Sequence, residues 1–418
     1  KTKNIYRKAL TMNCGFCKKK LTLEVIDLGN APITNNLLKK LSKKSFKYTY
    51  PLKVFVCDKC WLVQNKDKIN PKKIFTKNYP YFSSFSSSWL KHADNLTTKI
   101  INRFNLNKAS LVAEVASNDG YLLQYLKKKK IPCLGIEPTK STAMSAKKKG
   151  IKVLQKFFNT ETSKNLSKKY RADIIIAINV LAHVPNIKDF IKSFKILLKN
   201  NGVAIFEFHY VINLIKKKQF DTIYHEHYYY HSLFSLNKIF KNSGLKIFDA
   251  EKIKSHGGSL RIYVKNIESK KWKDTIRYKK IATEELALGI NKYLFYRKIK
   301  EDAVYIKNKF RKFLKNCKLK NQSVVGYGAA AKGITLINYS RIDKELMQYI
   351  IDKNPAKQNM FLPQSNIEII SAKILKKNKP DYVIILPWNL KNEIVKELSF
   401  IKSWGGKFVV FVPKFKII

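Results

Sequence analysis

The densest group of chemically active side chains lies at residues 221–232, which read DTIYHEHYYYHS. This segment holds three of the chain's seven histidines, one glutamate and four tyrosines. Such a cluster can take a proton, hold an oxyanion and pair with a polar substrate. We therefore place the chemical centre at Tyr224, Glu226 and His227. A polar, aromatic surface strand or turn is the alternative, because titratable groups also cluster away from functional sites.

Length and composition indicate a folded protein of several domains. At ~100–200 residues per domain, 418 residues correspond to two to four domains. No stretch reaches the ~18 consecutive apolar residues that a membrane helix needs, and the first residues, KTKNIYRKAL, lack the apolar core of a signal peptide. We expect a cytoplasmic protein that acts as a monomer.

The chain carries a net charge of +54, from 83 Lys plus Arg against 29 Asp plus Glu. A strongly basic chain can bind nucleic acid or an anionic membrane surface. Here the lysines are spread from end to end in short runs, and no nucleic-acid module is recognisable. We interpret the charge as a lysine-biased surface that favours phosphorylated substrates, and we expect no nucleic-acid or membrane partner. A basic zinc protein that binds nucleic acid remains an alternative.

Four of the six cysteines form two pairs, Cys14-x-x-Cys17 and Cys57-x-x-Cys60. Two such knuckles can complete a tetrahedral four-cysteine site, which structural zinc prefers and which leaves no open position for catalysis. We therefore predict a zinc ion that holds a small fold together. Reduced cysteines without metal, or a redox pair, are the alternatives. The other two cysteines are expected to be core residues: Cys133 and Cys317.

A run of alternating strands and helices follows. Residues 111–120, LVAEVASNDG, read as a strand that enters a polar turn before a helix, where backbone amides can approach a ligand. The next strand, 132–136, ends at Glu137, about 20 residues past the loop and placed to bind ribose hydroxyls. A third strand, 173–178, ends at Asn179. The alternation predicts a doubly wound sheet with ligands at the carboxyl ends of its strands.

The loop after the first of these strands differs from the dinucleotide fingerprint. It is similar to the E-x-G-x-x-x-G loop of class I S-adenosylmethionine methyltransferases, with Glu114 and Gly120 at the two ends. Ala116 stands where the first glycine is expected, which narrows the room for the cofactor. Upstream, residues 75–92 read FTKNYPYFSSFSSSWLKH. They predict a turn into a serine-capped helix, or a linker that offers hydroxyls to a ligand.

Six motifs now occur in order: the four-cysteine module, YPYxSSxSS, SNDG, GIEPT, NxLxHxP and IYxEH. Together they resemble the sugar C-methyltransferases that act on nucleotide-linked keto-deoxysugars. The resemblance covers nearly the whole chain. It implies an N-terminal zinc-binding domain, a central methyltransferase domain that binds S-adenosylmethionine, and a C-terminal α/β domain.

The resemblance also implies roles for particular residues. Glu137 would bind the cofactor ribose, and the loop 117–120 would cradle the methionine portion. The residues implied around the sugar are Tyr79, His183, Tyr224, Glu226 and His227. The predicted cofactor-binding set is Glu114, Ala116, Ser117, Asn118, Asp119, Gly120, Glu137 and Asn179.

The chemistry implied by the family fits these residue types. A carbon beside a ketone becomes nucleophilic when it loses a proton, and a histidine is suited to that step. We assign the base to His227, with Glu226 orienting its ring and Tyr224 donating to the enolate oxygen. We do not expect His225 to replace His227. A metal site formed by His225 and His227 is the less favoured alternative.

The last third of the chain predicts a helical connector and a second α/β unit. Residues 255–264 are expected to begin the C-terminal region with a strand, and residues 270–318 read as helical. Residues 323–333, SVVGYGAAAKG, with Asp352 further on, match a dinucleotide fingerprint. An NAD site is one interpretation. The resemblance argues against it and leaves open whether Lys332 and the loop amides hold the substrate diphosphate or are structural.

These observations predict an α/β protein with a zinc module at residues 1–78, a methyltransferase sheet at 79–252 and a Rossmann-like C-terminal domain at 253–418. The predicted function is C-methylation of a nucleotide-linked keto-deoxysugar with S-adenosylmethionine and structural zinc. The alternatives are a methyltransferase for another oxygen or carbon acceptor and an NAD-linked sugar-modifying enzyme.

Overall fold

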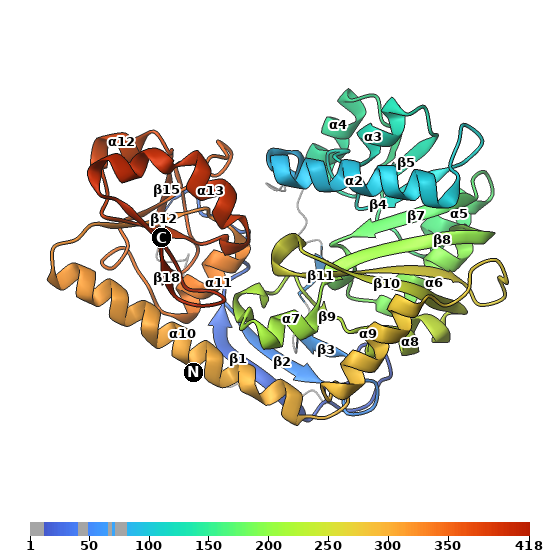
Figure 1. Ribbon diagram of the computed structural model, residues 1–418, viewed down its shortest axis with the longest axis horizontal. Helices are drawn as coiled ribbons and strands as arrows, with labels where there is room; N and C mark the ends of the chain where they lie inside the picture. The colour runs from blue at the N-terminus through green and yellow to red at the C-terminus, as the bar shows by residue number, and fades with distance from the viewer. Residues whose placement is uncertain (1–11, 41–48, 66–68, 72–81) are drawn as a thin grey trace, which may run out of the picture.

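The computed structural model describes residues 12–40, 49–65, 69–71 and 82–418. Its strands form three sheets within these ranges, one for each predicted unit. Figure 1 shows the two larger α/β units beside each other, with the strands of the zinc module below and between them. No helix in the described ranges is long and apolar enough to span a bilayer.

The zinc module is built on a four-stranded antiparallel sheet. Its order is β1 (Leu23–Ala31), β2 (Tyr50–Val56), β3 (Val63–Asn65) and β9 (Tyr229–Tyr230). The fourth strand comes from far along the chain, inside the segment that carries Tyr224 and His227. The small module and the predicted chemical centre therefore share one sheet.

The central sheet has seven strands in the order β10-β11-β8-β7-β4-β5-β6. Its parallel strands are β4 (Val112–Val115), β5 (Cys133–Ile136), β6 (Val153–Leu154), β7 (Ala172–Ile178) and β8 (Leu198–His209). The apolar run of β7 is buried on both faces, as expected for a strand covered by helices on each side. The predicted doubly wound methyltransferase sheet is confirmed.

Helices cover both faces of this sheet (Figure 1). The first, α2 (Ser87–Phe104), begins as predicted with a serine cap, because the Ser86 side chain accepts from the Trp89 amide and Trp89 is buried. The remaining helices of this unit are α3 (Leu123–Lys128), α4 (Lys140–Lys148), α5 (Thr160–Ser167), α6 (Ile187–Leu197), α7 (Val211–Lys216), α8 (Leu233–Asn242) and α9 (Ile276–Ala287). Short 3-10 turns carry several polar side chains: η2 (Ser83–Phe85), η3 (Leu181–His183), η4 (Phe220–Thr222) and η5 (Ser255–Gly257).

One strand lies in a different unit from the one expected. The sequence suggested that residues 255–264 begin the C-terminal region, but β11 (Ser259–Asn266) pairs antiparallel with both β8 and β10 (Leu245–Ile253) inside the central sheet. Its eight residues are all buried. The expected domain limit after residue 252 lies within the end of β10, whose partner β11 follows directly in the chain.

The expected helical stretch at 270–318 is two helices. After α9 the chain turns at Gly289, which has φ of 77°, and then forms α10 (Leu294–Leu319). Figure 1 shows α10 running along the lower edge of the molecule from the central domain to the C-terminal domain. It packs against β1 on the way, so it ties the three units together.

The C-terminal domain is a second seven-stranded sheet in the order β14-β15-β13-β12-β16-β17-β18. Its strands are β12 (Val324–Tyr327), β13 (Tyr349–Ile351), β14 (Met360–Phe361), β15 (Glu368–Ile370), β16 (Tyr382–Ile385), β17 (Lys407–Val410) and β18 (Lys416–Ile417). Its helices are α11 (Ala331–Tyr339), α12 (Ile374–Asn378) and α13 (Lys391–Glu397), with turns η6 (Trp388–Leu390) and η7 (Ser399–Trp404). Parallel pairing at its centre confirms the predicted Rossmann-like unit.

Candidate active site

The segment 221–232 is buried where the three units meet. Its strand β9 pairs with β3 of the zinc module, and the Tyr228 amide donates to the Ala182 carbonyl oxygen of the central domain. From the C-terminal domain, the Thr335 hydroxyl donates to the Ile223 carbonyl oxygen at 3.2 Å. The alternative of a surface strand or turn is therefore wrong. The other aromatic residues of the segment, which have no assigned role, are buried: Tyr228, Tyr229, Tyr230 and His231.

His227 is held in one tautomer. Its Nδ1 lies 2.8 Å from the Thr222 carbonyl oxygen, which can only accept, so Nδ1 carries the proton and Nε2 keeps a lone pair. Burial lowers the pKa of His227 well below its ordinary value, and the neighbouring His183 and Lys332 act in the same direction. The ring is therefore neutral at physiological pH. It lies 4.0 Å from the Tyr224 ring, centroid to centroid.

Glu226 does not orient the His227 ring as expected. The Thr222 carbonyl oxygen makes that contact. Glu226 Oε1 instead accepts from Thr34 Oγ1 at 2.8 Å and from the Asn35 amide at 3.2 Å and side-chain nitrogen at 3.1 Å. Burial raises the pKa of Glu226. Its Oε2 is buried and has no hydrogen-bond partner within the described residues.

The side chains of two further histidines, His183 and His225, point to different places. His183 Nδ1 donates to the Glu226 carbonyl oxygen at 2.7 Å, and its ring lies 4.8 Å from that of His227. Burial lowers the pKa of His183 to about 4. His225 instead reaches the Tyr50 carbonyl oxygen of β2 at 3.2 Å. His225 and His227 therefore point apart, and the cysteines are the one group in the described ranges that is suited to a metal ion.

A cavity of about 590 Å³ joins these side chains to the loop at residues 116–120, here called the donor loop. It reaches from the carboxyl ends of the central strands to the N-terminus of α11. Of the predicted sugar-site residues, four line it: His183, Tyr224, Glu226 and His227. Of the predicted cofactor set, Ala116, Asn118, Glu137 and Asn179 line it, whereas Glu114, Ser117, Asp119 and Gly120 lie behind its wall. Tyr79 lies outside the described residues.

The donor loop has the backbone shape that a glycine-rich loop would give. Ala116 and Asn118 both adopt left-handed conformations, with φ of 56° and 50°. Glu137 braces the loop, because its Oε2 accepts from the Asn118 amide at 2.9 Å and its Oε1 from the Thr139 amide at 2.8 Å. Burial raises the pKa of Glu137.

The same end of the cavity offers groups that suit S-adenosylmethionine. Asn179, at the end of β7, presents a buried Oδ1 that no described residue satisfies. Asn118 Oδ1 accepts from the Ser83 amide at 2.9 Å, which brings η2 over the loop. The Ser86 cap confirms the capped helix, and the Ser83 contact places η2 against the loop. That serine hydroxyls of this segment contact a ligand stays a prediction.

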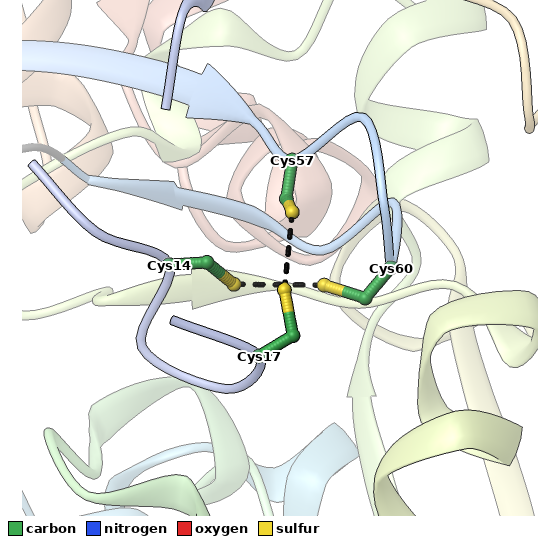
Figure 2. Close-up of side chains that lie close together, drawn as sticks. All are labelled: Cys14, Cys17, Cys57 and Cys60. Carbon is green, nitrogen blue, oxygen red and sulfur yellow. Dashed lines mark hydrogen bonds between the residues drawn. The ribbon is translucent and has the colours of Figure 1, made fainter. Parts of the chain in front are cut away.

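The four cysteine sulfurs converge, as Figure 2 shows. All lie within 4.8 Å of one another, with 3.5 Å between Cys14 and Cys60 and 3.4 Å between Cys17 and Cys57. Each knuckle closes through a backbone bond back to its first cysteine, from the Lys18 amide at 3.1 Å and from the Trp61 amide at 2.8 Å. Four converging thiolates fit one tetrahedral zinc ion.

Two histidines of the cavity lining were not singled out from the sequence, His209 and His256, whereas Lys332 was named only as a candidate for the substrate diphosphate. His209 ends β8, at the sheet edge where ligands bind, so its position offered a signal. His256 lies in the SHGGS turn with φ of 50°, a conformation unusual for a non-glycine residue and a sign of a constrained position. Burial lowers the pKa of His256 to about 3. Lys332 follows the second glycine-rich turn.

That second turn is packed as a structural element. A Cβ atom at Gly328 would lie 2.5 Å from Pro387, and one at Gly333 would lie 2.6 Å from Leu386. The predicted ribose-binding Asp352 accepts from the Ala329 amide at 2.9 Å and from the Asn354 amide at 2.9 Å. Its carboxylate thus closes its own loop, as the carboxylate of Glu137 does in the central domain.

Three family models match consecutive parts of the chain. They describe a zinc binding domain at residues 14–75, a methyltransferase domain at residues 89–250 and a C-methyltransferase C-terminal domain at residues 254–413. The C-methyltransferase NovU of Streptomyces niveus is 28% identical over 409 residues, which cover 97% of this chain and 96% of that protein.

Solved methyltransferase structures match part of the chain. The magnesium protoporphyrin IX methyltransferase of Synechocystis PCC 6803 with bound SAH is 16% identical, with a TM-score of 0.35, and the match covers 42% of this chain and 82% of that one. A S-adenosylmethionine-dependent methyltransferase of Clostridium acetobutylicum is 14% identical, with a TM-score of 0.35, over 42% of this chain and 91% of that one.

The donor loop, the doubly wound sheet and the matched domain define an S-adenosylmethionine-dependent methyltransferase. Its cofactors are S-adenosylmethionine and a structural zinc ion. The chain carries, in this order, a zinc-binding domain, a methyltransferase domain and a C-methyltransferase C-terminal domain, and it is similar to the C-methyltransferase NovU over nearly its whole length.

Proposed function

We propose that this enzyme methylates a carbon beside the ketone of a nucleotide-linked keto-deoxysugar. The observation that carries the proposal is the state of His227, a neutral imidazole with Nδ1–H bound to Thr222 and a basic Nε2, in the cavity that also contains the donor loop. Carbon acceptors need such a base, because a C–H group must lose its proton before it can attack.

In this proposal His227 removes the proton at the carbon beside the ketone. Tyr224, whose ring is tilted by 33° against that of His227, supplies the hydroxyl that donates to the developing oxyanion. His183 stands beside them, and we assign Tyr79 to the same group from the sequence alone. We assign Glu226 to the substrate rather than to the His227 ring, since its Oε2 is the carboxylate oxygen left without a described partner.

When bound, S-adenosylmethionine supplies the electrophilic methyl group. We propose that Glu137 holds its ribose, that the loop with Ala116 and Asn118 holds its methionine portion, and that Asn179 contributes a hydrogen bond. The residues behind the cavity wall then shape the loop: Glu114, Ser117, Asp119 and Gly120. Positioning the methyl group against the acceptor carbon supplies much of the remaining acceleration.

The nucleotide part of the acceptor is proposed from the charge at the far end of the cavity. There Lys357 and the N-terminal residues of α11, Ala330 and Ala331, form the lining. An ammonium group and the amides of a helix N-terminus both suit phosphate oxygens. The name of the relative NovU, a C-methyltransferase, supports carbon as the methylated atom.

The proposal is tested with a panel of nucleotide-linked keto-deoxysugars, S-adenosylmethionine and mass detection of a gain of one CH2. NMR of the product distinguishes a new C–CH3 group from an O–CH3 group. We expect C-methylation, and we expect His227→Asn to keep S-adenosylhomocysteine binding while it loses deuterium washout from the acceptor carbon. His225→Asn is the matched control and should remain active. An O–CH3 product, or full washout in His227→Asn, would contradict the proposal.

A further inference from the structure

Lys332 is a buried lysine whose side chain enters the acceptor end of the cavity. It is the second residue of α11 and is 9% exposed. Its Nζ donates to Asn389 Oδ1 at 2.7 Å and lies 4.6 Å from the centre of the Trp388 ring. These two contacts hold the ammonium group in place without neutralising it.

No described residue forms an ion pair with Lys332. The carboxylate that acts on it is Asp221, at the start of the segment that carries His227, and Asp221 Oδ2 is bound to the Trp388 indole nitrogen at 2.6 Å. Burial lowers the pKa of Lys332 to about 8, and Asp221 opposes this shift, so the side chain stays mostly protonated at neutral pH. A buried cation without a close counter-charge is costly, and such groups are typical of functional sites.

The positive charge of Lys332 affects the histidines that line the cavity. It is among the groups that lower the pKa of His227, and it acts likewise on His209 and His256. All of these rings line the same cavity. Because these histidines are neutral, Lys332 is the positive charge among them, and it can attract an anion that binds in the cavity next to His227.

We propose that Lys332 is the counter-charge for the oxyanion that forms on the acceptor when His227 takes its proton. This rests on the proposed function, in which the acceptor is a ketone. The C–H bond breaks, its proton goes to His227 Nε2 and its electron pair passes to the carbonyl oxygen. The enolate carbon then forms a bond to the methyl group as the donor's sulfur–carbon bond breaks, and the ketone is restored.

The nucleotide diphosphate is a second source of negative oxygen, and the two sources differ in what the loss of Lys332 would change. Loss of a contact to the oxyanion slows proton removal and leaves ground-state binding intact. Loss of a phosphate contact weakens binding of the nucleotide and leaves proton removal in the saturated enzyme intact. We favour the oxyanion because Lys332 lines the same cavity as His227 and carries one positive charge for one developing negative charge. Lys357, the other lysine of the lining, is already paired with Asp352 Oδ2 at 3.5 Å and donates to the Ala329 carbonyl oxygen at 2.8 Å.

The test compares the wild type with Lys332→Met and Lys332→Arg. The control is Lys353→Met, which removes an exposed lysine paired with Glu397 on the same domain. The probes are the keto-deoxysugar panel with S-adenosylhomocysteine in deuterated buffer, and thymidine diphosphate alone. The measurements are deuterium uptake at the acceptor carbon in saturated enzyme, the affinity for thymidine diphosphate and the melting temperature.

We expect Lys332→Met to slow deuterium uptake roughly 100-fold, the size of effect seen when one oxyanion partner is removed. Lys332→Arg should recover part of that loss, and Lys353→Met should match the wild type. Thymidine diphosphate affinity should change less than about threefold. The Lys332→Met protein should melt only modestly below the wild type, because Asp221 loses the charge of Lys332 but keeps its hydrogen bond from the Trp388 indole nitrogen.

Each other outcome overturns the proposal in a recognisable way. If Lys332→Met takes up deuterium as fast as the wild type but binds thymidine diphosphate weakly, the lysine holds phosphate. If it melts well below the wild type and Lys332→Arg recovers nothing, the lysine is structural. If the wild type takes up no deuterium with any keto sugar, the proposed acceptor is wrong, and the oxyanion role falls with it.

Discussion

Asn65 donates from its side-chain nitrogen to the carbonyl oxygen of His227 at 2.7 Å and to that of Tyr224 at 3.1 Å. Its backbone amide also donates to the Tyr228 carbonyl oxygen at 3.0 Å. Asn65 belongs to β3 of the zinc module, so this module fixes the turn that carries the proposed base. Its neighbour Gln64 donates to the Cys14 sulfur at 3.3 Å. Two successive residues of β3 therefore contact the metal site and the turn that carries the proposed base.

Asn65→Ala should reduce turnover more than it reduces donor binding. The change leaves two buried carbonyl oxygens without their donor, which costs about 1–3 kcal/mol of stability, and it frees the turn on which His227 sits. We expect at least a tenfold lower rate of methyl transfer and an unchanged affinity for S-adenosylhomocysteine, since the donor loop is in another domain. Calorimetric binding and single-turnover rates measure the two effects.

The control for Asn65 is Asn392→Ala, at an exposed position of α13. It should match the wild type in rate and melting temperature. If Asn65→Ala turned over at the wild-type rate despite a lower melting temperature, the two hydrogen bonds would stabilise the fold without positioning the turn.

Zinc removal should act on the same turn. A structural zinc ion supplies folding free energy, and Cys14 is joined to β3 through Gln64. We expect Cys14→Ser to lower zinc content and melting temperature together and to reduce methyl transfer as a consequence. Metal analysis of the purified protein and a thermal melt provide the readout. Activity lost at full zinc content and full thermal stability would instead indicate a direct catalytic role for the module.

The pH dependence should be set by Lys332 on the alkaline side. The pKa of His227 is lowered well below its ordinary value, so His227 stays in its basic form as pH falls towards 6.5 and turnover should not decline there. The pKa of Lys332 is lowered to about 8, so its positive charge is lost as pH rises through that value. We expect deuterium uptake to fall above about pH 8. Lys332→Arg should shift this decline to higher pH, because a guanidinium stays protonated. A decline at the same pH in both proteins would assign it to another group.

Much of the fold was readable from local signals. The two cysteine pairs, the apolar run of β7 and the Ser86 cap each encode their structure within a few residues, and the structure confirms the zinc module and both α/β units. The DTIYHEHYYYHS segment was also found as a cluster. Its residue types and spacing are local properties of the sequence.

What the sequence did not predict depends on contacts between distant segments. Glu226 beside His227 suggested a local pair, but Thr34 and Asn35 are hydrogen-bonded to it from about 190 positions away. The SVVGYGAAAKG pattern marked Lys332 as a candidate phosphate ligand, but its place in the same cavity as His227 depends on the packing of α11 against η4, which the pattern does not reveal. Similarly, the SLRIYVKN stretch reads as a strand in either domain, and only the pairing with β8 decides its sheet.

Ala116 offers a test of the donor loop. It holds φ of 56° at the position where the methyltransferase loop pattern has glycine, and a left-handed conformation costs a residue with a Cβ about 1 kcal/mol. Ala116→Gly should therefore raise the free energy of unfolding by up to that amount, less the extra entropy of the unfolded glycine. It should bind S-adenosylhomocysteine as tightly as the wild type or more tightly, because the loop gains room.

The matched control for Ala116 is Ala113→Gly, three residues earlier in the buried strand β4, where φ is not positive. There glycine removes a packed methyl group and gains no backbone relief, so the free energy of unfolding should fall by roughly 1 kcal/mol. Chemical denaturation of both variants gives the two signs directly. Equal destabilisation at both positions would mean that the left-handed conformation of Ala116 is not strained, and that the loop gains nothing from the glycine that the pattern contains.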